Sequence, residues 1–137
     1  MSVCRFHQSL FLIMRKIKVN YPLIGIVGPC AAGKTTLTAN LKNIGIDARH
    51  IAQEHSYVQT MWKRITDPDL LIFLDASYSE TIKRRNLNWS LEEYQEQHRR
   101  LNHARDNADF YLLTDDLTPD DVFSAVLFFL NSKNAIK

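Results

Sequence analysis

This sequence has few cysteines and few glycines, and its positive and negative charges nearly balance. The cysteine count and the charge balance each exclude some classes of protein. There are two cysteines, Cys4 and Cys30, four glycines, and a formal net charge of only +2. Cys4 falls in a terminal segment and Cys30 in a loop motif, so we expect no structural disulfide, and free thiols indicate a reducing, cytoplasmic setting. The small net charge gives no reason to expect a nucleic-acid or membrane partner.

The sequence also lacks a long apolar run. Its first apolar patch, residues 10–14, is too short to span a bilayer. No small-residue cleavage site follows this patch, and Arg15 and Lys16 come after it rather than before it, unlike in a secretory signal. We expect residues 1–14 to be an N-terminal extension outside the core, with Met14 a candidate start. Residues 15–137 then suit one domain with a single core.

Two of the four glycines stand in the stretch around which the chain is organised. Residues 28–35 read GPCAAGKT, which fits the phosphate-binding pattern G-x-x-x-x-G-K-[ST] at every specified position. A short apolar run precedes the motif and helical spacing follows it, as this motif requires. Such a loop can turn successive N–H groups inward as an anion nest at a helix N-terminus. We predict that the chain binds a nucleoside triphosphate through Gly28, Pro29, Cys30, Ala31, Ala32, Gly33, Lys34, Thr35 and Thr36.

Two residues of this motif carry chemical roles. Lys34 is expected to reach the β- and γ-phosphates, and the Thr35 hydroxyl to take one position on Mg²⁺. We interpret Cys30 as a small side chain that a tight loop needs, rather than as a reactive thiol. Replacing Lys34 by alanine is expected to abolish chemistry with little loss of folding.

Strand-like and helix-like segments alternate along the chain, which predicts a parallel α/β sheet with right-handed crossovers. The expected strands are 23–27, 46–52, 70–74 and 110–113, with a further edge segment at 17–20. The expected helices are 35–44, a short one near 58–65, 79–86, 90–107 and 118–132. The carboxyl ends of parallel strands gather ligands, and here those ends carry Gly28, Glu54, Asp75 and Asp115.

Residues 28–36, GPCAAGKTT, resemble the phosphate loop of the P-loop small-molecule kinases, which include nucleoside and nucleotide kinases, shikimate kinase and adenylylsulfate kinase. The segment PDLLIFLD at 68–75 is similar to the strand before the lid of thymidylate and deoxynucleoside kinases. The segments ADFYLLTD at 108–115 and LTPDDV at 117–122 resemble the final strand and helix of these families. The likeness covers roughly residues 23–130, and only the phosphate loop is highly specific.

This resemblance implies a three-layer P-loop NTPase-type sandwich with a short, mainly parallel sheet of four core strands. It implies ATP and Mg²⁺ as cofactors, and transfer of the γ-phosphoryl group to a nucleoside, a nucleotide or another small metabolite. It also places five arginines around the expected lid, where guanidinium groups grip phosphate oxygens: Arg84, Arg85, Arg99, Arg100 and Arg105. Arg84 and Arg85 are the better catalytic candidates, and a merely solvated basic helix is the alternative.

The chain departs from the family in the number of strands. These kinases usually have five core strands, and the strand that brings the metal-linked Walker B aspartate is not found here. Either the fold is trimmed, or Glu54 takes the vacant role, holding Mg²⁺ through water or accepting the acceptor's proton. Glu54 followed by Trp62 is similar to the general-base segment of deoxynucleoside kinases, although His55 stands where a proline is expected.

The remaining polar residues receive structural or secondary roles. Asp75 is expected to make structural hydrogen bonds, and Asp115 to cap a turn near the adenine-binding edge. We treat the histidines as unpaired, with His55 a candidate to contact the acceptor. The acceptor pocket has only residues 54–65 and the lid to draw on, which limits acceptor size or invites a second subunit.

A different class of function stays open. The chain could be a nucleotide-binding regulatory or interaction module without transferase activity, as the missing Walker B strand suggests. A GTPase switch is less favoured, because no [NT]KxD-like guanine motif follows a strand.

Overall fold

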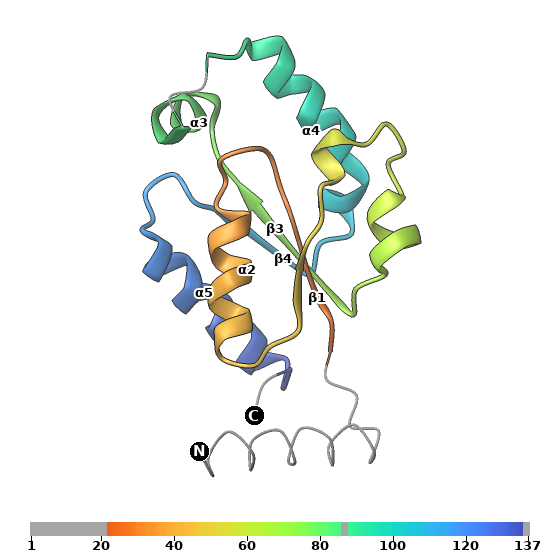
Figure 1. The fold of residues 1–137 in the computed structure, drawn as a ribbon, viewed down its shortest axis with the longest axis vertical. Helices are drawn as coiled ribbons and strands as arrows, with labels where there is room; N and C mark the ends of the chain where they lie inside the picture. Colours follow the sequence, from red (N-terminus) through yellow and green to blue (C-terminus); the bar gives the residue numbers. More distant parts are fainter. Residues whose placement is uncertain (1–21, 86–87, 136–137) are drawn as a thin grey trace, which may run out of the picture.

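The computed structural model describes residues 22–85 and 88–135, in which strands and helices alternate (Figure 1). The strands are β1 (Ile24–Val27), β2 (Ala48–His50), β3 (Leu70–Asp75) and β4 (Phe110–Leu113). The helices are α2 (Lys34–Asn43), α3 (Tyr78–Arg85), α4 (Leu91–Asp106) and α5 (Pro119–Ser132), with short turns η1 (Gln53–His55) and η2 (Trp62–Thr66). The expected extension at 1–14 and edge segment at 17–20 lie outside the described residues.

The four strands form one sheet in the order β2-β1-β3-β4, and every neighbouring pair is parallel. This confirms the predicted α/β class. Ile24 at the start of β1 pairs with Ala48 on one side and Leu70 on the other. The chain leaves β1 toward β2 but leaves β3 in the opposite direction, toward β4. The strand order therefore reverses between β1 and β3, and open α/β sheets bind their ligands at the carboxyl ends of the strands where this happens.

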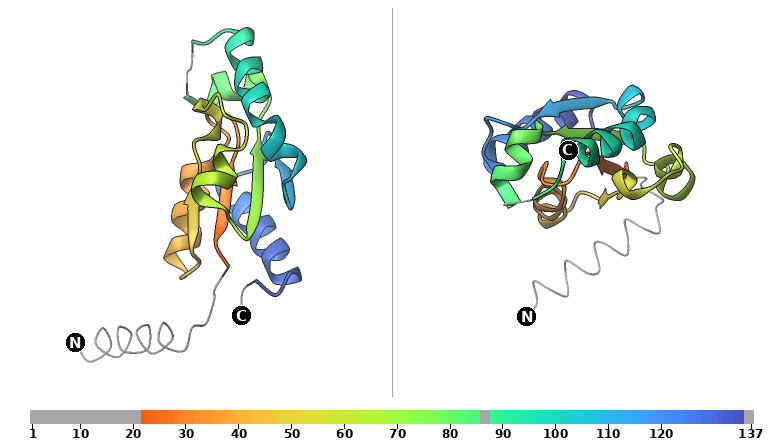
Figure 2. Two further views of the ribbon diagram at one scale, coloured as in Figure 1. Left: turned by 90° about the vertical axis from the view of Figure 1, so that its right-hand side faces the viewer. Right: turned by 90° about the horizontal axis from the view of Figure 1, so that it is seen from above.

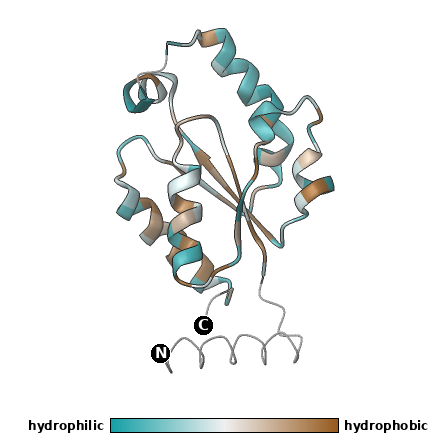
Figure 3. Ribbon diagram, viewed as in Figure 1, coloured by the Kyte–Doolittle hydropathy of each residue, from teal (hydrophilic) through white to brown (hydrophobic). Residues whose placement is uncertain are grey.

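Side chains of β1 and β3 alternate between two apolar cores, one on each face of the sheet. Ile24, Ile26, Ile72 and Leu74 join a core completed by α2 and α5. The alternate positions, including Leu71 and Phe73, join a second core with Trp62 of η2 and Leu101 of α4. Figures 1 and 2 show α2 and α5 on the opposite side of the strands from α4, an arrangement compatible with a three-layer sandwich. The strands are strongly apolar and α4 is mostly polar (Figure 3).

The helix ends follow the expected signals. Gly45, at φ +88°, follows α2, and the Ile46 N–H donates to the Leu41 carbonyl at 3.0 Å, which closes the helix as in a Schellman motif. At α5, Thr118 and Asp121 exchange side-chain and backbone hydrogen bonds as a complete capping box. At α4, the Ser90 hydroxyl accepts from the Glu93 N–H, which is one half of the expected box.

Two elements are shorter than predicted. The strand expected at 46–52 reduces to Ala48–His50, because within the described residues β2 pairs with β1 alone, and β1 has four residues. The helix expected near 58–65 is a π-helical turn, Trp62–Thr66. It ends at Asp67, which takes φ +45° immediately before Pro68.

The helices formed by residues 22–85 and 88–135 include none with the length and apolarity that a bilayer crossing requires.

Candidate functional site

The loop between β1 and α2, residues 28–33, is called here the glycine loop. Gly28 has φ +153°, and a Cβ at this position would lie 1.9 Å from the Leu74 carbonyl oxygen of β3. Gly33 has φ +101°, and Ala31 takes a left-handed φ of +67°. The loop therefore needs glycine at its start for close approach to β3, and it holds one alanine in a conformation that costs about 1–2 kcal/mol.

Lys34, the first residue of α2, turns its ammonium group back onto this loop. Its Nζ donates to the carbonyls of Gly28 at 2.7 Å and Pro29 at 2.9 Å. The same nitrogen lies 2.6 Å from Oε2 of Glu54, and the two side chains are 5% and 3% exposed. The second carboxylate oxygen, Oε1, is buried and has no hydrogen-bond partner among the described residues. Glu54 thus offers one free acceptor in a nearly dry position.

Glu54 reaches this position because its neighbour Gln53 fixes η1 against α4. Gln53 is fully buried, and its Nε2 donates to the carbonyls of Val58 at 2.9 Å and Arg100 at 3.2 Å. Its Oε1 accepts the Trp62 N–H at 2.8 Å. One buried amide therefore ties η1 to the turn at Val58, to η2 and to α4, and it holds Glu54 at the carboxyl end of the sheet.

Two adjoining cavities flank the glycine loop and share Ala31, Gly33, Thr36 and Arg84. The first, of about 280 Å³, is predominantly polar and is also lined by Cys30, Lys34, Thr35, His50, Glu54, His55 and Arg85. The second, of about 250 Å³, lies toward α5 and is mostly apolar, with Ala32, Leu37, Thr114, Leu117, Pro119 and Val122 in its wall. We call them the polar cavity and the apolar cavity. Six of the nine predicted loop residues line the polar cavity, and Gly28, Pro29 and Ala32 do not.

Arg84 of α3 lies where the two cavities meet. Its Nη1 donates to the Ala31 carbonyl at 3.1 Å and to the Thr114 hydroxyl at 2.8 Å, and its Nη2 donates to the Thr114 carbonyl. The Glu80 carboxylate of the same helix lies 3.3 Å from its Nε. Arg84 therefore connects α3, the glycine loop and the end of β4, and its planar group is held in place before any ligand arrives.

The other predicted arginines divide into two groups. Arg85 is exposed and lines the polar cavity, as expected. Arg99 and Arg100 pair with Glu96 along α4, and the guanidinium of Arg105 stands over the Tyr111 ring. The structure thus brings Arg84 and Arg85 to the polar cavity. Of the three arginines of α4, Arg100 also donates through Nη1 to the Glu54 carbonyl at 3.2 Å, whereas Arg99 and Arg105 are engaged elsewhere.

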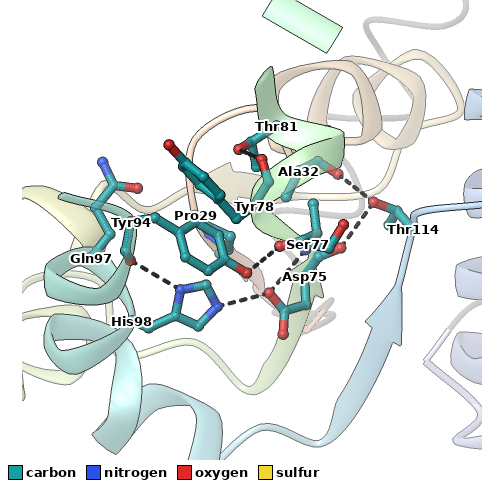
Figure 4. Close-up of polar contacts among 12 residues, drawn as sticks. Pro29, Ala32, Asp75, Ser77, Tyr78, Thr81, Tyr94, Gln97, His98 and Thr114 are labelled. Atoms are coloured by element: carbon teal, nitrogen blue, oxygen red, sulfur yellow. Dashed lines mark hydrogen bonds and ion pairs between the residues drawn. The ribbon is translucent and has the colours of Figure 1, made fainter. Parts of the chain in front are cut away.

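Asp75, at the end of β3, makes structural hydrogen bonds. Its carboxylate lies 3.0 Å from Nε2 of His98 (Figure 4). It also accepts from the Tyr111 hydroxyl at 2.6 Å and from the Ala76 N–H at 2.9 Å. Burial raises the pKa of Asp75, but the hydrogen bonds from His98 and Tyr111, the His98 charge and the Ala76 N–H together hold this pKa below its usual range. Asp75 therefore joins β3, β4 and α4.

The two tyrosines beside Asp75 respond in the opposite direction. Burial raises the pKa of Tyr94 and of Tyr111 to about 12 each. The negative charge of Asp75 contributes to both shifts, and its hydrogen bond adds to that of Tyr111. Asp115 lies nearby and accepts the Ser77 N–H at 2.9 Å, so it caps the turn that leads into α3.

Cys30 contacts two polar side chains that lie far from it in the sequence, those of Gln97 and His55. Its N–H donates to Oε1 of Gln97 at 3.0 Å, and Nε2 of Gln97 donates to its sulfur at 3.1 Å. Nε2 of His55 lies 3.9 Å from the same sulfur.

Burial lowers the pKa of His50, which lines the same polar cavity, and the Lys34 charge lowers this pKa further, while the Glu54 charge opposes the shift.

Sequence reasoning missed two residues at this site, Gln97 and Thr114. Both are buried polar side chains that contact the glycine loop directly or through Arg84. Gln97 shares a helical stripe with the buried Leu101 and Ala104, and a polar residue on that stripe is a usable signal. Thr114 has no comparable signal, because it simply follows a strand.

The site can hold an anion against Lys34 and two arginines while keeping one carboxylate oxygen free beside it. Comparison of the chain with protein-family models, curated proteins and solved structures finds no match. Its function is therefore inferred from its own residues.

Proposed function

We propose that this chain is a P-loop kinase that binds Mg²⁺-ATP and transfers the γ-phosphoryl group to a small acceptor. The observation that carries the proposal is the contact of Lys34 with Glu54 in the wall of the polar cavity. A phosphate-binding lysine and a carboxylate with one free oxygen meet there, as phosphoryl transfer requires of a charge stabiliser and a group that positions the nucleophile or the metal.

The two cavities suit the two halves of a nucleotide. The polar cavity presents Lys34, Arg84 and Arg85 beside the N-terminus of α2, which favours a polyphosphate. No side chain caps this helix end among the described residues, and its first turn has no acidic residue. The apolar cavity adjoins it across Arg84 and offers a surface for a base.

Each residue receives a role that its position supports. Lys34 exchanges the carbonyls of Gly28 and Pro29 for phosphate oxygens, and the arginines neutralise charge that spreads over the transferred group. Bound Mg²⁺ offsets phosphate charge, and the Thr35 hydroxyl and the Glu54 carboxylate are the residues that would hold it, Glu54 through water. Glu54 is alternatively the acceptor of the nucleophile's proton through its free Oε1.

Either the acceptor is small, or it enters the site from a direction other than the segment that contains η1 and η2. Gln53 and Trp62 fill the space between η1, η2 and α4, and the Trp62 indole N–H donates to Nδ1 of His103 at 3.1 Å. His55 is exposed and lines the polar cavity, so the acceptor meets it at the entrance. A second subunit at this entrance is the alternative way to complete the pocket.

The same filled space favours a second candidate, a nucleotide-binding regulatory or interaction module without transferase activity. Such a module needs the glycine loop and Lys34 but no acceptor pocket. Packing of Gln53 and Trp62 in the place where the kinase families hold their acceptor supports this reading.

Incubation with γ-labelled ATP, Mg²⁺ and a panel of nucleosides, nucleotides and small metabolites separates the two candidates. The kinase predicts label on one acceptor with the wild-type chain and with Lys42→Ala, a control lysine in the last turn of the same helix. It predicts no transfer with Lys34→Met or Glu54→Gln. Tight ATP binding without transfer to any acceptor, including those of a cell extract, would establish the module instead.

A further inference from the structure

Three side chains with metal-binding atoms meet beside the glycine loop. Cys30 comes from the loop, and Glu54 and His55 are consecutive in η1. Their nearest ligand atoms, the cysteine sulfur, a carboxylate oxygen and a ring nitrogen, all lie within 4.8 Å of one another. This group is not the set that holds Mg²⁺ with a nucleotide, because Mg²⁺ takes oxygen ligands and avoids thiolates.

The spacing is close to that of a bound transition metal. Sulfur and nitrogen ligands at about 2.3 Å and 2.0–2.1 Å from a tetrahedral zinc ion stand roughly 3.5 Å apart. In this chain the Cys30 sulfur and Nε2 of His55 are 3.9 Å apart, so a small side-chain adjustment brings them into range.

The carboxylate supplies a second, independent sign of a missing ligand. Glu54 is only 2% exposed, yet its Oε1 has no hydrogen-bond partner within the described part of the chain. A buried acceptor without a partner is costly, whereas a metal ion would satisfy it. Oε2 is already paired with Lys34, so Oε1 can bind a metal while that ion pair persists.

A supporting residue orients the thiol. Gln97 of α4 is buried and bonds Cys30 twice, through its Oε1 to the backbone N–H and through its Nε2 to the sulfur. Outer partners that orient a ligand in this way are a regular part of metal sites.

We propose that Cys30, Glu54 and His55 form a binding site for Zn²⁺ or a divalent metal of its class. The three ligands mix sulfur, nitrogen and oxygen, which suits zinc. All three line the polar cavity, so the fourth position faces the cavity, open to water or to a phosphate oxygen. The inference needs no nucleotide and is tested without one, although it engages the same Glu54 oxygen and the same cavity as the proposed kinase activity.

The test uses the full chain, reduced and freed of metal, titrated with Zn²⁺ by calorimetry and with Co²⁺ by absorption. One ion per chain is expected, with the near-ultraviolet thiolate-to-cobalt charge-transfer band and visible bands of tetrahedral cobalt. Cys30→Ser is expected to abolish the charge-transfer band. His55→Ala should weaken Zn²⁺ binding by about 100-fold. Loss of a residue that only supports a ligand costs about 10–100-fold in affinity, and loss of the ligand itself should cost at least as much.

Matched controls come from the chain itself. Cys4→Ser removes the only other cysteine, and His50→Ala removes a second histidine from the same cavity, so both should bind Zn²⁺ as the wild type does. Circular dichroism verifies that each variant is folded. The proposal is overturned if the wild type gives no thiolate band, if Cys30→Ser retains it, or if Cys4→Ser loses it.

Discussion

The ammonium nitrogen of Lys34 and Oε2 of Glu54 lie 2.6 Å apart where solvent reaches neither side chain appreciably. The pair joins the start of α2, which precedes β2 in the chain, to η1, which follows β2. Since Lys34 also donates to the carbonyls of Gly28 and Pro29, this one ammonium group holds the glycine loop and the segment after β2 together. The residue that the sequence marks for phosphate binding is thus also part of the structural framework.

Replacing Lys34 by alanine is therefore expected to cost stability as well as chemistry. The substitution leaves Glu54 buried without its partner, which typically costs about 3–5 kcal/mol. This revises the expectation from the sequence that folding would be little affected. The double variant Lys34→Met with Glu54→Gln should recover much of the loss, because no uncompensated charge remains. Urea unfolding of both variants measures this, and a cost below about 1 kcal/mol, as for an exposed pair, would contradict it.

Neutralising Glu54 should strengthen the binding of a nucleotide without Mg²⁺. The carboxylate competes with phosphate for Lys34 and repels phosphate oxygens. Removing one unit charge about 4 Å away gains about 1 kcal/mol even in bulk water, so we expect at least a roughly fivefold gain in affinity at this buried position. Calorimetric titration of Glu54→Gln with ATP in the presence of a chelator tests this. Glu80→Gln, which neutralises the carboxylate beside Arg84, is the control for a general charge effect. Weaker binding by Glu54→Gln would show that phosphate does not approach Lys34 from this side.

The two glycines of the loop should respond very differently to alanine. At Gly28 the new Cβ would lie 1.9 Å from the Leu74 carbonyl oxygen, so β3 or the loop must move. We expect a loss of about 3 kcal/mol or more. At Gly33 no atom lies within 4 Å of the new Cβ, and only the φ of +101° is unfavourable, which costs about 1–2 kcal/mol. Thermal and urea unfolding compare the two variants, and equal losses would mean that the loop relaxes away from β3.

The sequence was sufficient to predict the class of fold and most of the element order. Strand and helix periodicity, the cap at Thr118 and the glycine at 45 are local signals, and each corresponds to an observed element boundary. The extent of β2 was not predictable in this way, since it depends on the four-residue length of its neighbour β1. Strand pairing limits such an element more strongly than its own alternation of apolar residues.

The site was predicted only in part, for a similar reason. Because the carboxyl ends of parallel strands converge, Glu54 was expected near the glycine loop, and it lies there. The same rule could not predict that Lys34 pairs with Glu54. The contacts of Gln97 with Cys30 and of Arg84 with Thr114 join residues 67 and 30 positions apart, respectively. Contacts of this kind follow from how α3 and α4 pack on the sheet, which no local pattern specifies.

The hydrogen-bonded group around Asp75 leads to a prediction about alkaline pH. The pKa of Tyr111 is raised to about 12 from 10.0, so its contribution to stability is complete below pH 10 and is lost as the pH rises toward about 12. Asp75→Asn removes the negative charge that helps to raise the pKa values of both Tyr94 and Tyr111. Both pKa values should therefore fall toward 10, although burial, the larger cause, persists.

Ultraviolet titration of phenolate absorbance in the wild type and in Asp75→Asn measures this shift. Asp106→Asn, a neutralised carboxylate on the exposed surface of α4, should leave the titration of the two tyrosines unchanged. On the acid side the sign is opposite. The Asp75 pKa lies below 3.8, so its stabilising contribution is present above pH 3.8 and lost as the pH falls through the lowered value. If Asp75→Asn left the alkaline titration unaltered, Asp75 would not be the charge that holds Tyr111 protonated, and its role in joining β3 to β4 would have to rest on the backbone alone.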